Sequence, residues 1–389
     1  MLALIMAGAG SVTLKIEKLA AGGDGLAFYG GRAVFVPFAL PGETVLAVIK
    51  EEKKDFSLAA LVTILEPSPN RVEPACPIYG ECGGCGLQHL AYPCQLEEKT
   101  SLVRESLKRI GHIELDEIAA VPSLPFSYRN RVQFHFTPEG RIGFMKRGSS
   151  QVVEARSCPV AVKAIRSWME ERSGGTRGFE ELKNYVVGKD RFIAFGAGNE
   201  VYVEGRNGVI EVTLLGKRIS FHIRGFFQSN LYLLEYFIPD VVADLSGRAV
   251  ADLYGGVGLF SAFLGSAFEK TVCVENDPFS IELAKRNAPN SVNEFYPISV
   301  EDWIKGSSAR RHYDAILVDP PRTGLSPSVR AWLAQKRAPV IVYVSCDHAT
   351  LARDAADLKK AGYRLESLKV FDFFPQTGHA ECHARFRLG

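Results

Sequence analysis

The sequence predicts an α/β protein in three parts: a small β-barrel, a mixed α+β region and a C-terminal, mainly parallel sheet with crossover helices. Three observations predict this fold class. The chain of 389 residues has room for two or three domains. Five short strands with turn signals fit between residues 11 and 66. From Ala249 onward, apolar runs alternate with stretches of helical length and period, which is typical of βαβ units.

The composition is that of an ordinary globular protein. Hydrophobic residues make up 47% of the chain and charged residues 23%, and 46 basic against 44 acidic residues give a net charge of +2. These values exclude disordered, collagen-like and coiled-coil chains, and they leave any nucleic-acid partner to a local patch. No apolar run approaches the roughly 20 residues of a membrane span, and the apolar segment 1–10 is too short for a signal peptide. We therefore expect a cytoplasmic protein with no membrane partner, whose eight cysteines are reduced.

The N-terminal segment has the pattern of short, half-buried strands. Val12, Leu14 and Ile16 alternate with polar residues, and Gly30-Gly31 predicts a hairpin turn. Further strands are expected at 26–29, 32–37, 44–50 and 58–65, and Pro67, Pro69 and Pro74 mark a linker. A closed or nearly closed barrel of this size either carries oligonucleotides or serves as a structural cap.

A cysteine cluster follows the linker. Cys76, Cys82 and Cys85 lie close together, and Cys158 is a distant fourth cysteine, with Cys94 as a rival. Four thiolates can hold zinc or an iron–sulfur cluster. Three close ligands and one distant one favour a [4Fe–4S] cluster over structural zinc, which usually has two short paired knuckles.

Basic and aromatic residues are interleaved in the middle of the chain, between a helix expected near 91–111 and another near 160–172. Such a pattern can bind single-stranded or looped RNA, because cations follow phosphates and aromatic rings stack on unpaired bases. The alternative is a strand pair with one solvated face. The residues are Arg129, Arg131, Arg141, Lys146 and Arg147 with Tyr128, Phe134, Phe136 and Phe144.

A glycine turn follows the first strand of the C-terminal pattern. Asp252 ends the strand, Gly255-Gly-Val-Gly258 turns toward a helix, and Glu275 ends the next strand. Glycines such as Gly255 let a ligand lie against the backbone, and an acid such as Glu275 can accept both ribose hydroxyls. Ser261 stands where a dinucleotide fingerprint needs glycine, and there is no Walker lysine. The turn therefore favours S-adenosylmethionine over a dinucleotide or a triphosphate.

The next strand ends in Asp319-Pro-Pro-Arg322. Two prolines cannot continue a sheet, so the chain stiffens at the carboxyl edge, where ligands bind in open α/β sheets. Methyltransferases that act on exocyclic amines also carry Asp/Asn-Pro-Pro here. The motif therefore indicates a planar base near a methyl donor, and it leaves the reacting atom open.

Two further residues, Cys346 and Glu381, indicate which atom of the base is methylated. Cys346 ends a buried strand directly before a helix, whose N-terminus can stabilise a thiolate, and Glu381 stands at a loop-to-strand junction near the same edge. Carbon 5 of uracil is too weak a nucleophile to take a methyl group directly. A thiolate added at carbon 6 makes the ring an enolate with charge at carbon 5, and a carboxylate can then remove the carbon 5 proton.

Together these segments resemble the TRAM-domain, iron–sulfur-containing RNA uracil-5-methyltransferases, of the type that makes 5-methyluridine in 23S ribosomal RNA. The resemblance covers nearly the whole chain and includes segments 14–20, 128–131 and 226–230. It implies Cys346 as the nucleophile and Glu381 as the base. It further implies that the methyl donor contacts Gln228, Tyr254, Glu275 and Asp319. It also implies a [4Fe–4S] cluster, which excludes Cys94 and is held by Cys76, Cys82, Cys85 and Cys158.

The implied architecture is a TRAM/OB-like barrel over 11–66, a central α+β iron–sulfur domain over 67–235 and a class I methyltransferase domain over 236–389. We expect a monomer that acts on RNA. Gly255 stands where many members have cysteine and His348 where many have proline. The alternatives are the same chemistry on transfer RNA, an amine methyltransferase that uses Asp-Pro-Pro, and a non-catalytic RNA-binding iron–sulfur protein.

Overall fold

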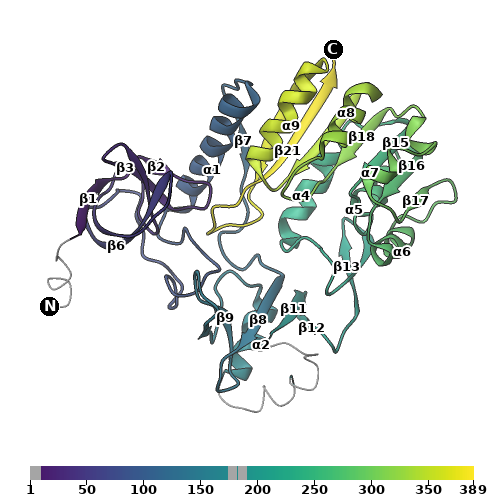
Figure 1. Ribbon diagram of the computed structural model, residues 1–389. Helices are drawn as coiled ribbons and strands as arrows, with labels where there is room; N and C mark the ends of the chain where they lie inside the picture. The colour runs from purple at the N-terminus through teal and green to yellow at the C-terminus, as the bar shows by residue number, and fades with distance from the viewer. Residues whose placement is uncertain (1–9, 174–181, 183–190) are drawn as a thin grey trace.

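The computed structural model describes residues 10–173, 182 and 191–389. The apolar segment 1–10, which we interpreted above, lies outside these residues except for Gly10. A strongly curved sheet is formed by the N-terminal part of the chain, a second sheet lies beside it, and a large sheet covered by helices is formed by the C-terminal part (Figure 1). None of the described helices is both long and apolar enough to cross a membrane.

The N-terminal sheet has six strands in the order β1-β5-β6-β4-β3-β2. The five expected strands are present, and the sequence pattern missed the two-residue strand β2. β4 and β6 pair in parallel and the other pairs are antiparallel. The hydrogen-bonded ladder is open, with β1 and β2 at its edges. Its strands are β1 (Ser11–Lys15), β2 (Lys18–Leu19), β3 (Gly25–Tyr29), β4 (Arg32–Val36), β5 (Thr44–Glu52) and β6 (Phe56–Glu66).

The second sheet is antiparallel throughout, with the order β10-β9-β8-β11-β12. Helix α2 (Lys163–Arg172) packs against it around a core of Phe134, Phe192 and Trp168. A separate hairpin follows. The elements are β8 (Arg131–Phe136), β9 (Ile142–Met145), β10 (Val152–Glu154), β11 (Arg191–Ala197), β12 (Glu200–Val203), β13 (Val209–Leu214) and β14 (Lys217–His222).

The large sheet has eight strands in the order β17-β16-β15-β18-β19-β21-β20-β7. The expected parallel pairing is confirmed for β17, β16, β15, β18 and β19, whereas β21 runs antiparallel to both neighbours. The strand order reverses at β15, so the carboxyl ends of β15 and β18 form the crevice where ligands bind in such sheets. Besides β7, which is described below, its strands are β15 (Gly247–Leu253), β16 (Phe268–Val274), β17 (Glu294–Tyr296), β18 (Ala315–Val318), β19 (Val340–Ser345), β20 (Tyr363–Phe371) and β21 (Glu381–Leu388).

Helices cover both faces of this sheet. One face packs against α1, α7, α8 and α9, and the other against α4, α5 and α6. Side-chain caps fix several helix starts; Asp277 and Asp347, for example, accept the first free N–H groups of α6 and α9. The helices are α4 (Leu231–Val242), α5 (Leu259–Leu264), α6 (Pro278–Asn287), α7 (Val300–Trp303), α8 (Pro327–Lys336) and α9 (His348–Lys360).

Two elements from the middle of the sequence also belong to this layer. Helix α1 (Tyr92–Ser106) and the π-helical turn Leu107–Gly111 pack against α9. Strand β7 (Ala119–Val121) pairs in parallel with β20 and forms an edge of the sheet. The helix predicted near 91–111 is therefore confirmed, and it packs against the C-terminal layer rather than the second sheet.

Candidate active site

The glycine turn after β15 requires backbone conformations and close contacts that suit glycine. Gly256 and Gly258 have φ of +55° and +71°. A Cβ on Gly258 would lie 2.8 Å from the Cβ of Ala284 in α6, so glycine lets α5 begin close to α6. A Cβ on Gly255 would lie 2.6 Å from the Sγ of Cys273, so that sulfur fills the space a side chain at 255 would need.

Asp252 and Asp319 lie next to this turn, and neither carboxyl has a basic partner in the part of the chain that the structure describes. Asp252 is fully buried; its Oδ2 accepts from the N–H and hydroxyl of Ser261 at 3.0 and 2.6 Å, while its Oδ1 has no partner among the described residues. Burial raises the pKa of Asp252 to about 6. Burial, together with the charges of Asp252 and Glu275, raises the pKa of Asp319 to about 7. Such a site favours a cation, and S-adenosylmethionine carries an ammonium and a sulfonium, so these residues fit that donor.

A cavity of about 510 Å³, which Glu275 lines but Asp252 and Asp319 do not, is formed by the ends of β15 and β16, the start of α7 and the loop after β18. The carboxylate of Glu275 is fixed at its edge, because Gly256 N–H donates to Oε2 at 3.1 Å and Asp277 N–H to Oε1 at 2.9 Å. The sequence pattern missed three lining residues: one directly follows Glu275, and the other two stand at the start of α7, after a strand of only three residues. These residues are Asn276, Ser299 and Glu301.

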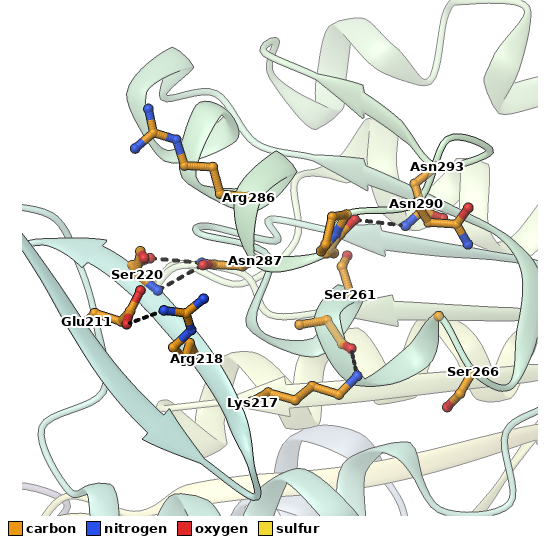
Figure 2. Close-up of a pocket in the computed structure, with 14 residues that line it drawn as sticks. Glu211, Lys217, Arg218, Ser220, Ser261, Ser266, Arg286, Asn287, Asn290 and Asn293 are labelled. Atoms are coloured by element: carbon orange, nitrogen blue, oxygen red, sulfur yellow. Dashed lines mark hydrogen bonds and ion pairs between the residues drawn. The ribbon is translucent and has the colours of Figure 1, made fainter.

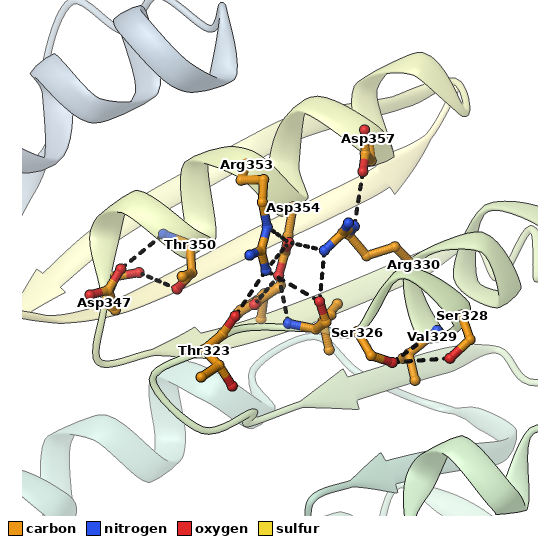
Figure 3. A network of polar contacts seen from close by, with 12 residues as sticks. Thr323, Ser326, Ser328, Val329, Arg330, Asp347, Thr350, Arg353, Asp354 and Asp357 are labelled. Atoms are coloured by element: carbon orange, nitrogen blue, oxygen red, sulfur yellow. Dashed lines mark hydrogen bonds and ion pairs between the residues drawn. The ribbon is translucent and has the colours of Figure 1, made fainter.

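A buried carboxylate holds the loop after β18 against α9 (Figure 3). Asp354 is 0% exposed, and its Oδ2 accepts from Leu325 N–H at 2.8 Å and from the hydroxyl of Tyr343 at 2.7 Å. Its Oδ1 accepts from Arg330 at 3.2 Å and from Arg353 at 2.8 Å. The network fixes the segment that begins with Asp319-Pro-Pro.

The structure brings Cys346 and Glu381 together. Ser345, the last residue of β19, pairs with Cys382 of β21, so Cys346 and Glu381 continue the same register. Glu381 is only 3% exposed, and Cys346 is half-buried. Both lie within electrostatic reach of Asp319, so the two residues predicted for catalysis and one predicted for donor binding occupy one edge of the sheet.

The sequence left the pKa of the Cys346 thiol open, and the structure raises it. Burial, with the charge of Glu381, raises the pKa of the Cys346 thiol to about 11. Two of the free N–H groups at the start of α9 are occupied, because the Asp347 side chain accepts from Ala349 and Thr350 at 3.0 and 2.9 Å. Burial and Asp319 also raise the pKa of Glu381 well above its usual range. The guanidinium of Arg322 lowers the pKa of both groups in part, a role the sequence analysis did not assign.

Gln228 lies in a segment that two asparagines hold in place. Asn130 N–H donates to Ser229 O at 2.7 Å, and its Oδ1 accepts from Leu231 N–H at 3.0 Å. Asn230 caps α4 and donates to Phe373 O at 3.2 Å. The segments 128–131 and 226–230, which carried the family resemblance, therefore contact each other, and Gln228 itself is 8% exposed.

The four predicted cluster ligands line one cavity. Cys76, Cys82, Cys85 and Cys158 surround it together with Arg129, and Cys94 is not among the lining residues. All five cysteines are free thiols. In the described part of the chain, no group of three or more His, Cys, Asp or Glu side chains is arranged as a metal-binding group.

The basic and aromatic segment is only partly available to RNA. Tyr128 and Phe134 are 1% and 0% exposed, so these two aromatic residues belong to the core and do not present a face on which a base could stack. Arg141 pairs with Glu154 at 2.7 Å. Arg147 pairs with Asp24 at 2.5 Å, which joins this region to the N-terminal sheet.

A larger cleft of about 730 Å³ lies between the β13–β14 hairpin and helices α5 and α6 (Figure 2). Its polar groups mostly bind one another: Asn287 makes two hydrogen bonds to the backbone of Ser220 at 2.8 Å, and Lys217 donates to Ala262 O at 2.5 Å. None of the residues predicted for catalysis or donor binding lines it. The smaller cavity at the carboxyl edge, by contrast, is lined by Tyr254 and Glu275, two of the residues predicted for donor binding.

The switch-point crevice, the glycine turn and the surrounding carboxyls define a methyltransferase that uses S-adenosylmethionine. A family model described as tRNA (Uracil-5-)-methyltransferase matches residues 218–386. The 23S rRNA (uracil(1939)-C(5))-methyltransferase of Shewanella sediminis is 32% identical, over 97% of this chain and 96% of its own. An uncharacterized RNA methyltransferase of Treponema denticola is also 32% identical, over 96% and 98%.

A solved structure gives the same result over the whole chain. The tRNA (uracil-54, C5)-methyltransferase of Pyrococcus abyssi, in complex with S-adenosyl-L-homocysteine, is 27% identical with a TM-score of 0.76, and the match covers 96% of this chain and 99% of that one. The chain belongs to the RNA (uracil-5-)-methyltransferase family and is an S-adenosylmethionine-dependent enzyme of that class.

Proposed function

We propose that this enzyme methylates carbon 5 of one uridine in 23S ribosomal RNA through a transient bond between Cys346 and carbon 6 of the base. The observation that carries the proposal is the register of β19 and β21, which sets Cys346 beside Glu381 near Asp319. Methylation of an exocyclic amine needs neither a thiolate nor this carboxylate. In this proposal a monomer uses residues 11–66 as a TRAM barrel, 67–235 as a central domain and 236–389 for catalysis.

The reaction follows from the positions of the two groups. The Cys346 sulfur, once deprotonated, forms a bond to carbon 6, and the displaced π electrons make an enolate with charge at carbon 5. Carbon 5 then takes the methyl group, which the bound donor supplies. The Glu381 carboxylate removes the carbon 5 proton, and the electrons of that C–H bond restore the double bond as the sulfur leaves carbon 6.

Five residues hold the donor in this proposal. Asp319 faces its cationic part, Glu275 accepts hydrogen bonds from the ribose, and Gln228, Tyr254 and Gly255 complete the site around the glycine turn. Support comes from the 510 Å³ cavity, which Tyr254 and Glu275 line. The unpartnered Oδ1 of Asp252 adds a further acceptor for a cation.

The RNA must present its uridine outside the base stack, because the thiolate and the donor approach different atoms of one ring. Phe226 is 73% exposed and stands just before Gln228. A free aromatic ring at the site offers a stacking surface for an extruded or neighbouring base.

We further propose that Cys76, Cys82, Cys85 and Cys158 hold a [4Fe–4S] cluster. The support is that all four line one cavity beside the cation of Arg129, as suits an anionic thiolate-bound group. Anaerobically purified protein is expected to contain iron and to absorb broadly near 400 nm, and Cys158→Ser is expected to remove both signals. Cys94→Ser is the matched control; colourless wild-type protein that contains zinc would contradict the proposal.

Substitution of the catalytic pair tests the mechanism. With labelled donor and RNA, Glu381→Gln is expected to accumulate a methylated RNA–protein adduct that survives denaturant, because the carbon 5 proton cannot leave. Cys346→Ala is expected to form no adduct and no product. An active Cys346→Ala variant would instead favour amine methylation. Folded Glu381→Gln that binds RNA without forming an adduct would exclude the base assignment.

A second candidate is the same chemistry on transfer RNA. It is favoured by the structural match to the tRNA (uracil-54, C5)-methyltransferase of Pyrococcus abyssi. Mapping 5-methyluridine in ribosomal and transfer RNA from cells with and without the protein separates the two substrates. Loss of the modification from 23S RNA alone is the result that we expect.

A further inference from the structure

Gln376 lies in the loop between β20 and β21 that leads into Glu381. It is 3% exposed and has φ of +67°, a conformation that residues other than glycine adopt only where the surroundings enforce it. Its N–H donates to Gln95 Oε1 at 2.9 Å, and its own side-chain oxygen accepts from Gln95 Nε2 at 2.9 Å. Its Nε2 donates to Pro125 O at 3.1 Å.

The carbonyl of Gln376 joins the loop to the cysteine segment. It accepts from the N–H groups of both Gly86 and Leu87 at 2.9 Å, directly after Cys85 in the chain. Thus α1, the cysteine segment, the segment after β7 and the loop before Glu381 meet at one buried residue, through its side chain and its backbone. All of its hydrogen-bonding groups have partners, as is required of a buried amide.

The rest of the loop has little freedom to move. Thr377 donates to Phe374 O at 2.8 Å, and His379 N–H donates to the Thr377 hydroxyl at 3.2 Å. A Cβ on Gly378 would lie 2.7 Å from Gly23 N, so this part of the loop packs directly against the N-terminal sheet. We therefore expect that a displacement of the backbone at Gln376 would also displace Glu381.

We propose that Gln376 is a positioning residue that holds the Glu381 carboxylate where it can reach the carbon 5 proton. The inference rests on the proposed role of Glu381 as the base. A base must stand within hydrogen-bond distance of the proton it removes, and an error of about 1 Å can cost on the order of a hundredfold in rate. Proton removal is the step that loss of Gln376 should slow.

Single-turnover experiments with labelled donor and RNA separate this step from those before it. For Gln376→Ala we expect adduct formation within a few-fold of wild type, product release slowed at least tenfold and a visible methylated adduct in a denaturing gel. Gln95→Ala, which removes the partner, is expected to give the same pattern. Gln335→Ala, on the exposed surface of α8, is the matched control and is expected to behave as wild type.

Gln376→Gly provides a second variant, because glycine keeps the backbone carbonyl and adopts the positive φ without strain. If Glu381→Gln traps the adduct while Gln376→Ala or, should that variant not fold, Gln376→Gly releases product at the wild-type rate, the inference is overturned. It is also overturned if formation and release slow equally, since that pattern indicates a general structural role. If Glu381→Gln traps nothing, the proposed base fails instead.

Discussion

At the residue scale, the proposed donor site has two carboxyls, Asp252 and Asp319, that no basic side chain of the described residues neutralises. Their pKa values are raised to about 6 and about 7. Near pH 7 these carboxyls are therefore partly protonated in the donor-free protein. A cationic donor favours the ionised carboxylates, so its binding should release protons.

We therefore predict that donor affinity falls as the pH drops below about 7. Below the pKa of the donor-free carboxyls, each protonated group must lose its proton before it can pair with the donor. The Kd therefore rises roughly tenfold for each pH unit and each such group. Calorimetric titration between pH 5.5 and 8.5 measures this. Asp319→Asn is expected to abolish the dependence near pH 7 and to weaken binding at high pH. A Kd for the wild type that does not change with pH would contradict the prediction.

The sequence predicted which residues lie together at the candidate site better than it predicted how they are ionised. Cys346 and Glu381 could be predicted because each stands where a strand meets a loop at one sheet edge. Their raised pKa values depend on burial and on mutual proximity, which no local pattern records. The sequence could not decide the role of Tyr128 for the same reason: an aromatic residue next to arginines fits RNA stacking, yet its hydroxyl donates to Pro375 O at 2.9 Å in the interior.

At the element scale, the loop that follows Asp319 depends on α9. Gly324 has φ of +70°, and a Cβ there would lie 2.8 Å from Asp354 Oδ2. Asp354 therefore packs against the loop backbone as well as binding the loop through Leu325 N–H. The sequence predicted both the loop and the helix, but it could not predict this contact between them.

We predict that Asp354→Ala destabilises the protein by about 3–5 kcal/mol, because it leaves Arg330 and Arg353 without their buried acceptor. Donor affinity is expected to fall with it, since the loop borders the cavity. Asp357→Ala is the matched control: Asp357 pairs with the same Arg330 at 2.9 Å but is 40% exposed, so a loss below about 1 kcal/mol is expected. Denaturant unfolding and donor titration measure both effects; equal losses for the two variants would contradict the role of Asp354.

At the scale of the whole molecule, segments far apart in the sequence meet at the loop before Glu381. The parallel order of the large sheet could be predicted from the apolar runs. The positions of α1 and β7 could not, because both precede the second sheet in sequence and yet pack against the C-terminal layer. Their contacts depend on pairings across more than two hundred residues, such as Lys99 with Asp372 at a separation of 273.

That buried ion pair connects α1 to the end of β20. Lys99 and Asp372 are 1% and 0% exposed; Lys99 Nζ donates to Asp372 Oδ1 at 2.6 Å and to Phe374 O at 3.0 Å.

We predict that Lys99→Met costs about 3–5 kcal/mol in unfolding free energy, because it leaves a buried carboxylate unpaired. Adding Asp372→Asn is expected to restore much of the loss, since an amide carries no charge to desolvate. Lys18→Met, which breaks the half-exposed pair with Glu105, is expected to cost below about 1 kcal/mol. If Lys99→Met cost no more than Lys18→Met, the ion pair would not be what holds α1 to the loop.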